Sequence, residues 1–277
     1  MKLHMRDKTG WADLLFPLLV FAFALAFGSQ ALAGISTTKH NLSTGGTGSN
    51  HLTAGTAEIC VFCHTPHGAN TSVKAPLWNK ALPPSVYTTY SSATSSTIDG
   101  TVSLATSVSL ACLSCHDGTQ AMDNMINAPG SGGYNAAGAR LAGATWTANV
   151  GASGQMPGTT VAMLSTDLTN DHPVAIQFCG GGLTGGGGSV VSGTCNDGDF
   201  NQSKVLAKVV GATQVFWVST DANATRDKVD FPLFNNSGNV GPSVECASCH
   251  DPHSSTNATF LRISNAGSAV CLTCHNK

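Results

Sequence analysis

One apolar segment stands out along a chain whose other hydrophobic residues are scattered. Leu14–Phe27 is an apolar run of 14 residues, interrupted only by Pro17. Basic residues precede the run, and an Ala-Leu-Ala segment ending at Ala33 follows it. This order of basic, apolar and small residues predicts a secretory signal peptide over residues 1–33, cleaved after Ala33. The alternative is a membrane anchor, but the run is shorter than the roughly 20 residues that span a bilayer.

The rest of the pattern predicts little regular secondary structure. Ser, Thr, Gly and Asn dominate residues 35–57, 84–109 and 127–160, which favours loops over long helices or strands. Lys204–Ser219 differs because β-branched and aromatic residues are frequent there, and Gly211 in its middle predicts a turn. We therefore expect one small β-rich region in a chain otherwise made of loops and short helices.

Composition makes the surface unusually neutral. Charged residues are only 10% of the 277, with 13 Lys and Arg against 15 Asp and Glu, a formal net charge of −2. These numbers exclude a cationic nucleic-acid-binding surface and a highly charged disordered chain. No later segment is long and apolar enough to cross a bilayer, so we expect a soluble chain after export.

Four cysteine pairs, each followed directly by a histidine, are the strongest chemical signal. The Cys-x-x-Cys-His motifs begin at Cys60, Cys112, Cys246 and Cys271. This spacing is the attachment signature for haem c, in which two thiols bind one haem and the adjacent histidine ligates its iron. A thioredoxin-like pair or half of a zinc site also uses Cys-x-x-Cys, but neither requires the following histidine.

We therefore expect four covalently bound haem c groups. The attachment cysteines are Cys60, Cys63, Cys112, Cys115, Cys246, Cys249, Cys271 and Cys274. The proximal iron ligands are His64, His116, His250 and His275.

The two remaining cysteines, Cys179 and Cys195, flank a glycine-rich segment. Export places them in an oxidising compartment, where disulfides persist and free thiols are disfavoured. A disulfide between them would close a loop of about 15 residues and stabilise the fold by roughly 3 kcal/mol in the chain-entropy model. We expect this bond and a structural role for it.

The number of histidines available as distal iron ligands helps to distinguish an electron carrier from an enzyme. A haem that only carries electrons has both axial positions filled, whereas a catalytic haem keeps one position open. Five histidines remain once the signal peptide and the proximal ligands are set aside, which is enough for four irons. The predicted distal ligands are His40, His67, His172 and His253, with His51 as the alternative to His40. Ligation by a methionine is the less favoured alternative, with the candidates Met122, Met125, Met156 and Met163.

A repeated motif suggests how the distal ligands are shared. His67 and His253 each follow a proximal ligand in the pattern His-x-Pro-His. A histidine at that spacing lies on the wrong face of its own haem, so we expect each to ligate a neighbouring haem. The repeat indicates an internal duplication of the chain. Symmetry between the halves pairs His40 or His51 with His64, His67 with His116, His172 with His250, and His253 with His275.

The motifs and the β-rich region together predict the organisation of the chain. Residues 34–126 would hold the first haem pair, 127–240 a loop and β-rich insert with the disulfide, and 241–277 the second haem pair. The three segments would form one continuous tetrahaem unit. The fold class we expect is a multihaem cytochrome c, with loops and short helices wrapped around stacked haems that replace much of the usual core.

The segments around the motifs resemble a known family. Cys60–Asn70 followed by Ala75–Asn79, Cys112–Thr119 and Cys246–His253 are similar to the doubled CXXCH group of multihaem cytochromes. Lys39–Ser43 near the start adds a likeness to the extracellular tetrahaem members of that group, which polymerise into nanowires. The resemblance implies bis-histidine haems, extracellular electron transfer and a histidine given by one subunit to a haem of the next.

These expectations favour an electron conduit. The resemblance favours His40 over His51, and it implies a secreted or cell-surface protein whose copies join head to tail in a conductive filament. Other cytochromes and an extracellular electron acceptor would be its redox partners. The alternative is a monomeric secreted or periplasmic tetrahaem carrier, which the haem motifs do not distinguish from a filament subunit. A multihaem reductase is less favoured because it needs an open iron, so we expect no enzymatic activity.

Overall fold

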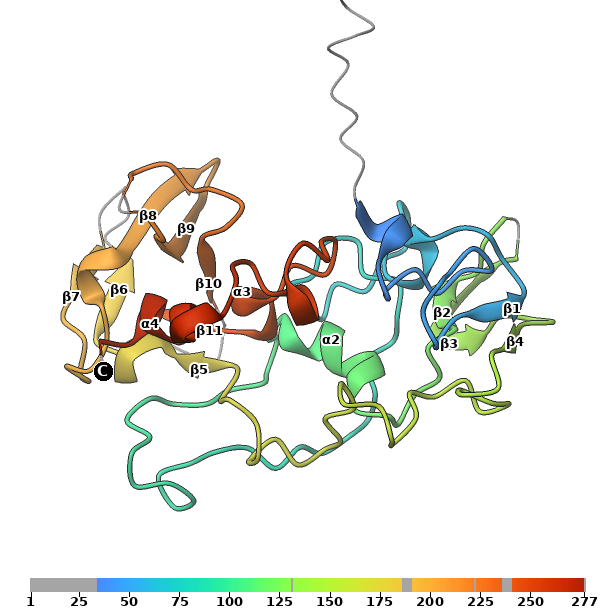
Figure 1. Cartoon of the computed structure of the whole chain (residues 1–277), viewed down its shortest axis with the longest axis horizontal. Coiled ribbons are helices and arrows are strands. Elements are labelled where there is room, and N and C mark those ends of the chain that lie inside the picture. Colours follow the sequence, from blue (N-terminus) through green and yellow to red (C-terminus); the bar gives the residue numbers. More distant parts are fainter. Residues whose placement is uncertain (1–33, 131, 186–190, 222, 236–240, 277) are drawn as a thin grey trace, which may run out of the picture. The chain divides into compact units, whose positions relative to one another are not determined.

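The computed structural model describes residues 34–130, 132–185, 191–221, 223–235 and 241–276 (Figure 1). The predicted signal peptide, residues 1–33, lies outside the described residues. Gly34–Lys277 groups as a single unit. Within the described ranges, helices are too short or too polar for any of them to cross a membrane.

Helices in the described residues are short. The α-helices are α2 Ser109–His116, α3 Cys246–Cys249 and α4 Ala269–Cys274. The 3-10 turns are η1 Gly34–Thr37, η2 Cys60–Phe62, η3 Phe178–Gly180, η4 Gln202–Lys204, η5 Ala258–Phe260 and η6 Ala266–Ser268. Each Cys-x-x-Cys-His motif thus lies on a helical turn, in the order η2, α2, α3 and α4. A helical turn brings the two cysteines of a motif to neighbouring positions on one side of the backbone.

The strands form small antiparallel sheets. They are β1 Leu52–Ala54, β2 Asn124–Asn127, β3 Tyr134–Arg140, β4 Thr145–Trp146, β5 Ile176–Gln177, β6 Leu183–Gly185, β7 Val191–Gly193, β8 Val205–Val210, β9 Thr213–Val218, β10 Phe231–Asn235 and β11 Pro242–Val244. β1 pairs with β4, β2 with β3 and β6 with β7, and a larger sheet has the order β5-β11-β10-β9-β8. Because β11 leads directly into α3, this sheet continues from the predicted insert into the segment that carries the third motif.

The predicted strand region at Lys204–Ser219 is a β-hairpin. β8 and β9 pair in continuous register from Val205 with Val218 to Val210 with Thr213, and Figure 1 shows both strands in orange. Gly211 lies in the turn with a φ of 62°, a backbone conformation that glycine adopts without steric cost. The β-branched and aromatic residues therefore predicted the strands correctly, and Gly211 predicted the turn.

The loop prediction for residues 127–160 is partly wrong. β3 crosses this segment and pairs with β2, although its Ala, Gly and Asn residues have low strand propensity. The pairing is supported by an ion pair between Arg140 Nε and the fully buried Asp123 Oδ1, 3.0 Å apart. Tertiary contacts therefore override the local composition here.

The hydrophobic side chains gather in clusters that touch the attachment cysteines. One cluster, which includes Leu52, Phe62 and Met122, packs against both Cys63 and Cys115. A second cluster lies on the larger sheet, includes Phe178 and Phe216, and packs against Cys249 and Cys274. The apolar core is thus built around the attachment segments.

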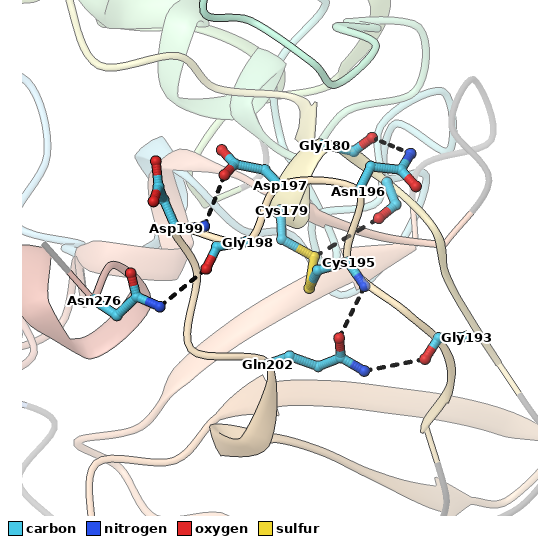
Figure 2. The surroundings of a disulfide bond; sticks show 11 residues. Cys179, Gly180, Gly193, Cys195, Asn196, Asp197, Gly198, Asp199, Gln202 and Asn276 are labelled. Carbon is cyan, nitrogen blue, oxygen red and sulfur yellow. Dashed lines mark hydrogen bonds between the residues drawn. A yellow bond between two sulfur atoms is a disulfide. The ribbon is translucent and has the colours of Figure 1, made fainter.

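The structure pairs Cys179 with Cys195 in a disulfide with an S–S distance of 2.06 Å, shown in Figure 2. Gln202 lies in the segment that follows the disulfide. Its side-chain Oε1 accepts a hydrogen bond from the Cys195 backbone N–H at 2.9 Å, which links that segment to the disulfide. Asn201 Nδ2 then donates to the carbonyls of Leu272 and His275, at 3.1 and 2.9 Å. The segment that follows the disulfide therefore also fastens the end of the fourth motif.

We expect the double variant Cys179→Ser with Cys195→Ser to lose about 3 kcal/mol of unfolding free energy, because the unfolded chain regains loop entropy. Urea denaturation of the haem-loaded protein, followed by far-UV circular dichroism, measures the loss. The exposed substitution Val161→Ser is the control, since that side chain is 96% exposed and should leave the midpoint unchanged. An unchanged midpoint in the double variant would show that the disulfide adds no stability.

Candidate functional site

Burial keeps several of the motif cysteines in the neutral thiol form. Burial is the main cause that raises the pKa of Cys63 and Cys274 to about 12 and that of Cys249 to about 11. A metal ion such as zinc binds the thiolate rather than the thiol. These environments therefore suit a sulfur capped by a covalent bond better than a thiolate ligand. Among the described residues, no three His, Cys, Asp or Glu side chains converge on a common point that would hold a metal ion.

Consecutive motifs lie beside one another in the order of the sequence. Cys63 of the first motif and Cys115 of the second pack against the same hydrophobic cluster. α2 packs against α3, and the thiols of Cys112 and Cys246 shift each other's pKa. The third and fourth motifs meet at the second hydrophobic cluster. Groups bound at these motifs would form a row in which each has a neighbour.

Proximal histidines are oriented through one ring nitrogen. In three of them Nδ1 donates to a backbone carbonyl at 2.7 Å. These bonds are His64 to Pro76, His116 to Ala162 and His250 to Thr259. Such a bond fixes the tautomer and leaves Nε2 as the nitrogen that can ligate a metal. Carbonyls from other parts of the same chain thus orient these imidazoles with Nε2 available to ligate a metal.

The fourth proximal histidine is held by an aromatic ring. Phe200 forms a backbone bridge with His275, and their ring centroids are 4.2 Å apart with an interplanar angle of 46°. Phe178 contacts Phe200 in turn, at 5.1 Å. His275 is therefore positioned by residues of the region that also contains the disulfide.

His64 and His253 form the first pair of facing imidazoles. Their ring centroids are 6.1 Å apart and the ring planes are inclined by 21°. A metal ion bound by two opposed imidazoles, at about 2 Å from each nitrogen, separates the ring centroids by about 6 Å. His253 Nδ1 lies 3.6 Å from Asp251 Oδ1, so its Nε2 is also left for ligation. The pair has the spacing of two axial ligands of one iron.

His40 and His116 form the second pair. Their centroids are also 6.1 Å apart, but the ring planes are nearly perpendicular at 80°. His40 Nδ1 donates to the Pro252 carbonyl at 3.1 Å, and its ring stacks on Phe260 at 4.4 Å. Burial lowers the pKa of both imidazoles, which favours the neutral form that binds metals.

The structure thus differs from the pairing expected from internal symmetry. That hypothesis kept each ligand within its own half of the chain, with His253 opposite His275. Instead, His253 faces His64 and His40 faces His116. The reason is the contact between α2 and α3 and the position of Pro252 next to His40, which bring the loop after the third motif to the first two motifs.

The other predicted distal ligands lie in loops. His51 Nδ1 donates to the Gly48 carbonyl at 2.6 Å, and His172 Nδ1 donates to the Pro173 carbonyl at 3.0 Å. The His67 side chain is exposed. Their role as distal iron ligands stays a prediction.

Sequence reasoning missed the groups that orient the imidazoles. Backbone carbonyls such as those of Pro76, Ala162 and Thr259 leave no residue-type signal, because every residue has one. Asp251 had a detectable signal, since it lies between the two histidines of the repeated motif. Met122 and Met125, the methionine alternatives, are buried in the first hydrophobic cluster.

The donor set fits haem c. Each motif offers two sulfurs and an adjacent imidazole, and two motifs also have a second imidazole opposite the first. Trp78 lies against His64, with centroids 6.2 Å apart, and its buried indole N–H has no acceptor among the described residues. A bound group with carboxylate side chains supplies such acceptors. The residues present therefore match the chemistry that the motifs predict.

Comparison with known proteins identifies one of these segments. A family model described as the doubled CXXCH motif matches residues 240–277, which hold the third and fourth motifs. Comparison with curated proteins gave no match. Residues 240–277 thus carry a doubled CXXCH motif, consistent with a multihaem c-type cytochrome, and the motifs of this chain imply covalently bound haem c.

Proposed function

We propose that the chain is a tetrahaem electron-transfer protein with histidine at both axial positions of each iron. When bound, haem c supplies an iron that alternates between the ferric and ferrous states. The single observation that carries the proposal is the pair of facing imidazole sets, His64 with His253 and His40 with His116. Ligands on both sides of an iron exclude substrates from it, which is typical of a carrier rather than an enzyme.

The chain's own residues perform the remaining tasks. The motif cysteines would hold four groups in a row, because consecutive motifs are neighbours. Backbone carbonyls hold the proximal imidazoles in one tautomer. Apolar clusters pack against one cysteine of each motif, with Cys63 and Cys115 sharing one cluster and Cys249 and Cys274 another. This apolar packing would limit the rearrangement of solvent that accompanies a change of charge. Two of the three histidines His51, His67 and His172 would supply the distal ligands of the third and fourth irons.

The proposal extends to location and assembly. Residues 1–33 would direct export, so the mature chain would act outside the cell or at its surface, with the periplasm as the alternative. Copies would join head to tail in a filament, passing electrons between partner cytochromes and an extracellular acceptor. The small net charge of −2 supports close stacking of copies. The second candidate is a monomeric tetrahaem carrier.

Haem content tests the attachment sites. We expect the intact mass of the purified protein to correspond to four covalent haems. Replacing both cysteines of any one motif by alanine should remove one haem, because both thioether bonds are lost. Replacing Cys179 and Cys195 instead should remove none, since they form the disulfide. Loss of a haem from that control, or a full set in a motif variant, would contradict the assignment.

Electron paramagnetic resonance tests the two imidazole pairs. Nearly parallel and nearly perpendicular axial planes give different low-spin ferric signals, so the angles of 21° and 80° predict one signal of each kind. We expect His253→Met to change the first signal alone and His40→Met the second alone. Each variant is the control for the other. A His253→Met variant that leaves the near-parallel signal intact would refute the pairing with His64.

Cryo-electron microscopy of sheared, haem-staining material from the cell exterior tests assembly. We expect helical polymers with a continuous row of haems running through successive subunits. Separate particles, even at high protein concentration, would favour the monomeric carrier and leave the haem assignments untouched.

A further inference from the structure

Two buried charges of opposite sign lie beside the motifs and have no part in attachment or ligation. The first is Lys80, whose side chain is fully buried. Its Nζ donates to the carbonyls of Ala121, Met122 and Asn124, at 3.4, 2.9 and 2.8 Å. Three acceptors engage three N–H groups, and only the ammonium form carries three. The site therefore holds a positive charge.

Lys80 lies next to the first motif. The preceding residue, Asn79, donates its backbone N–H to the Cys63 carbonyl at 2.9 Å and its side-chain amide to the Val61 carbonyl at 2.7 Å. The ammonium is close enough to Cys63 to oppose the effect of burial on that thiol. A haem attached at Cys60 and Cys63 would therefore have a buried cation at its side.

The second charge is Glu245, which is 1% exposed. Its Oε2 accepts from the Ser107 hydroxyl at 2.5 Å and from the Ser109 hydroxyl. Those hydroxyl oxygens themselves accept backbone N–H groups, from Ser109 and Cys246, each at 3.0 Å. Their hydrogens are therefore directed at the carboxylate, an arrangement that stabilises its ionised form.

Glu245 lies between the second and third motifs. It immediately precedes α3, and it forms a reciprocal cap with Ser248 in which each side chain accepts the other's backbone N–H. Its charge raises the pKa of both Cys112 and Cys246, although the effect of these two thiols on each other is larger. A buried anion is thus shared by two attachment sites.

A third charge, that of Arg262, makes the electrostatic surroundings of the third motif different from those of the second. The Arg262 guanidinium donates to the carbonyls of Ala247 and Ser248, at 2.9 and 3.1 Å, and acts on Cys249. Arg262 thus offsets the charge of Glu245 at the third motif.

We propose that Lys80 and Glu245 give the first two haems unequal reduction potentials, with the first raised and the second lowered. This inference rests on the proposed function, because it requires haems at both motifs. A nearby cation favours the ferrous state, which has one positive charge fewer, and a nearby anion favours the ferric state. Buried charges are screened little by salt, so both effects persist under physiological conditions. Electrons shared by the two haems would then collect on the first.

The test is a potentiometric titration of the haem-loaded variants Lys80→Met and Glu245→Gln. The first and second haems are followed through their separate paramagnetic resonance signals. We expect Lys80→Met to lower the midpoint of the first haem and Glu245→Gln to raise that of the second. Each change should be on the order of tenfold in the ratio of reduced to oxidised haem, about 59 mV for one electron.

Exposed residues provide the matched controls. Lys208→Met and Glu58→Gln make the same chemical changes at solvent-exposed positions and should leave both midpoints in place. Lys80→Arg retains the positive charge and should retain the wild-type midpoint. Shifts of the same sign in both test variants, or shifts no larger than the controls, would show that Lys80 and Glu245 are structural only.

The outcomes separate this inference from the proposed function. A protein without covalent haem, or without the two low-spin signals, contradicts the proposed function itself. A protein with both signals but unmoved midpoints contradicts only the role of the two charges. If Lys80→Met does not bind haem, the titration of Glu245→Gln still tests the inference. A midpoint of the second haem that is lowered or unchanged in that variant would overturn it.

Discussion

The placement of two imidazole pairs, each with ring centroids 6.1 Å apart, is the constraint on which the proposed haem sites depend. His64 faces His253, and His40 faces His116, so both pairs join segments far apart in the sequence. Regular secondary structure contributes little to that juxtaposition. Loops are fastened instead by backbone carbonyls, such as that of Pro252 on His40 Nδ1. A chain rich in Ser, Gly and Asn can form such loops because these residues accept the irregular backbone conformations of turns.

Local features of the sequence predicted the local parts of the site. The attachment motifs and the hairpin around Gly211 depend on residues within a few positions of one another. The position of His253 opposite His64 depends on tertiary contacts, whereas symmetry between the halves paired His253 with His275. β3 was missed because its pairing with β2 comes from tertiary contact. Lys80 and Glu245 look like ordinary surface charges in the sequence, and only their buried hydrogen bonds reveal otherwise.

The polar interior is arranged around charge as much as around apolar surface. Lys80 is satisfied by carbonyls, Glu245 by hydroxyls and Asp123 by Arg140. A buried charge is tolerated only with such partners, because its desolvation is otherwise costly. Around the proposed haems, whose charge would change with each electron transferred, fixed charges of this kind would give each position its own electrostatic environment.

The dipeptide Pro252-His253 serves both imidazole pairs. The Pro252 carbonyl orients His40, which faces His116, while the next residue faces His64. The N-terminal segment therefore contains the cysteines of two sites but cannot finish either one alone. If the chain is exported and ligates haem as proposed, the first two motifs would emerge long before this dipeptide, and both sites would lack a ligand until the C-terminal segment follows. Their completion would then be a single cooperative event near the end of folding.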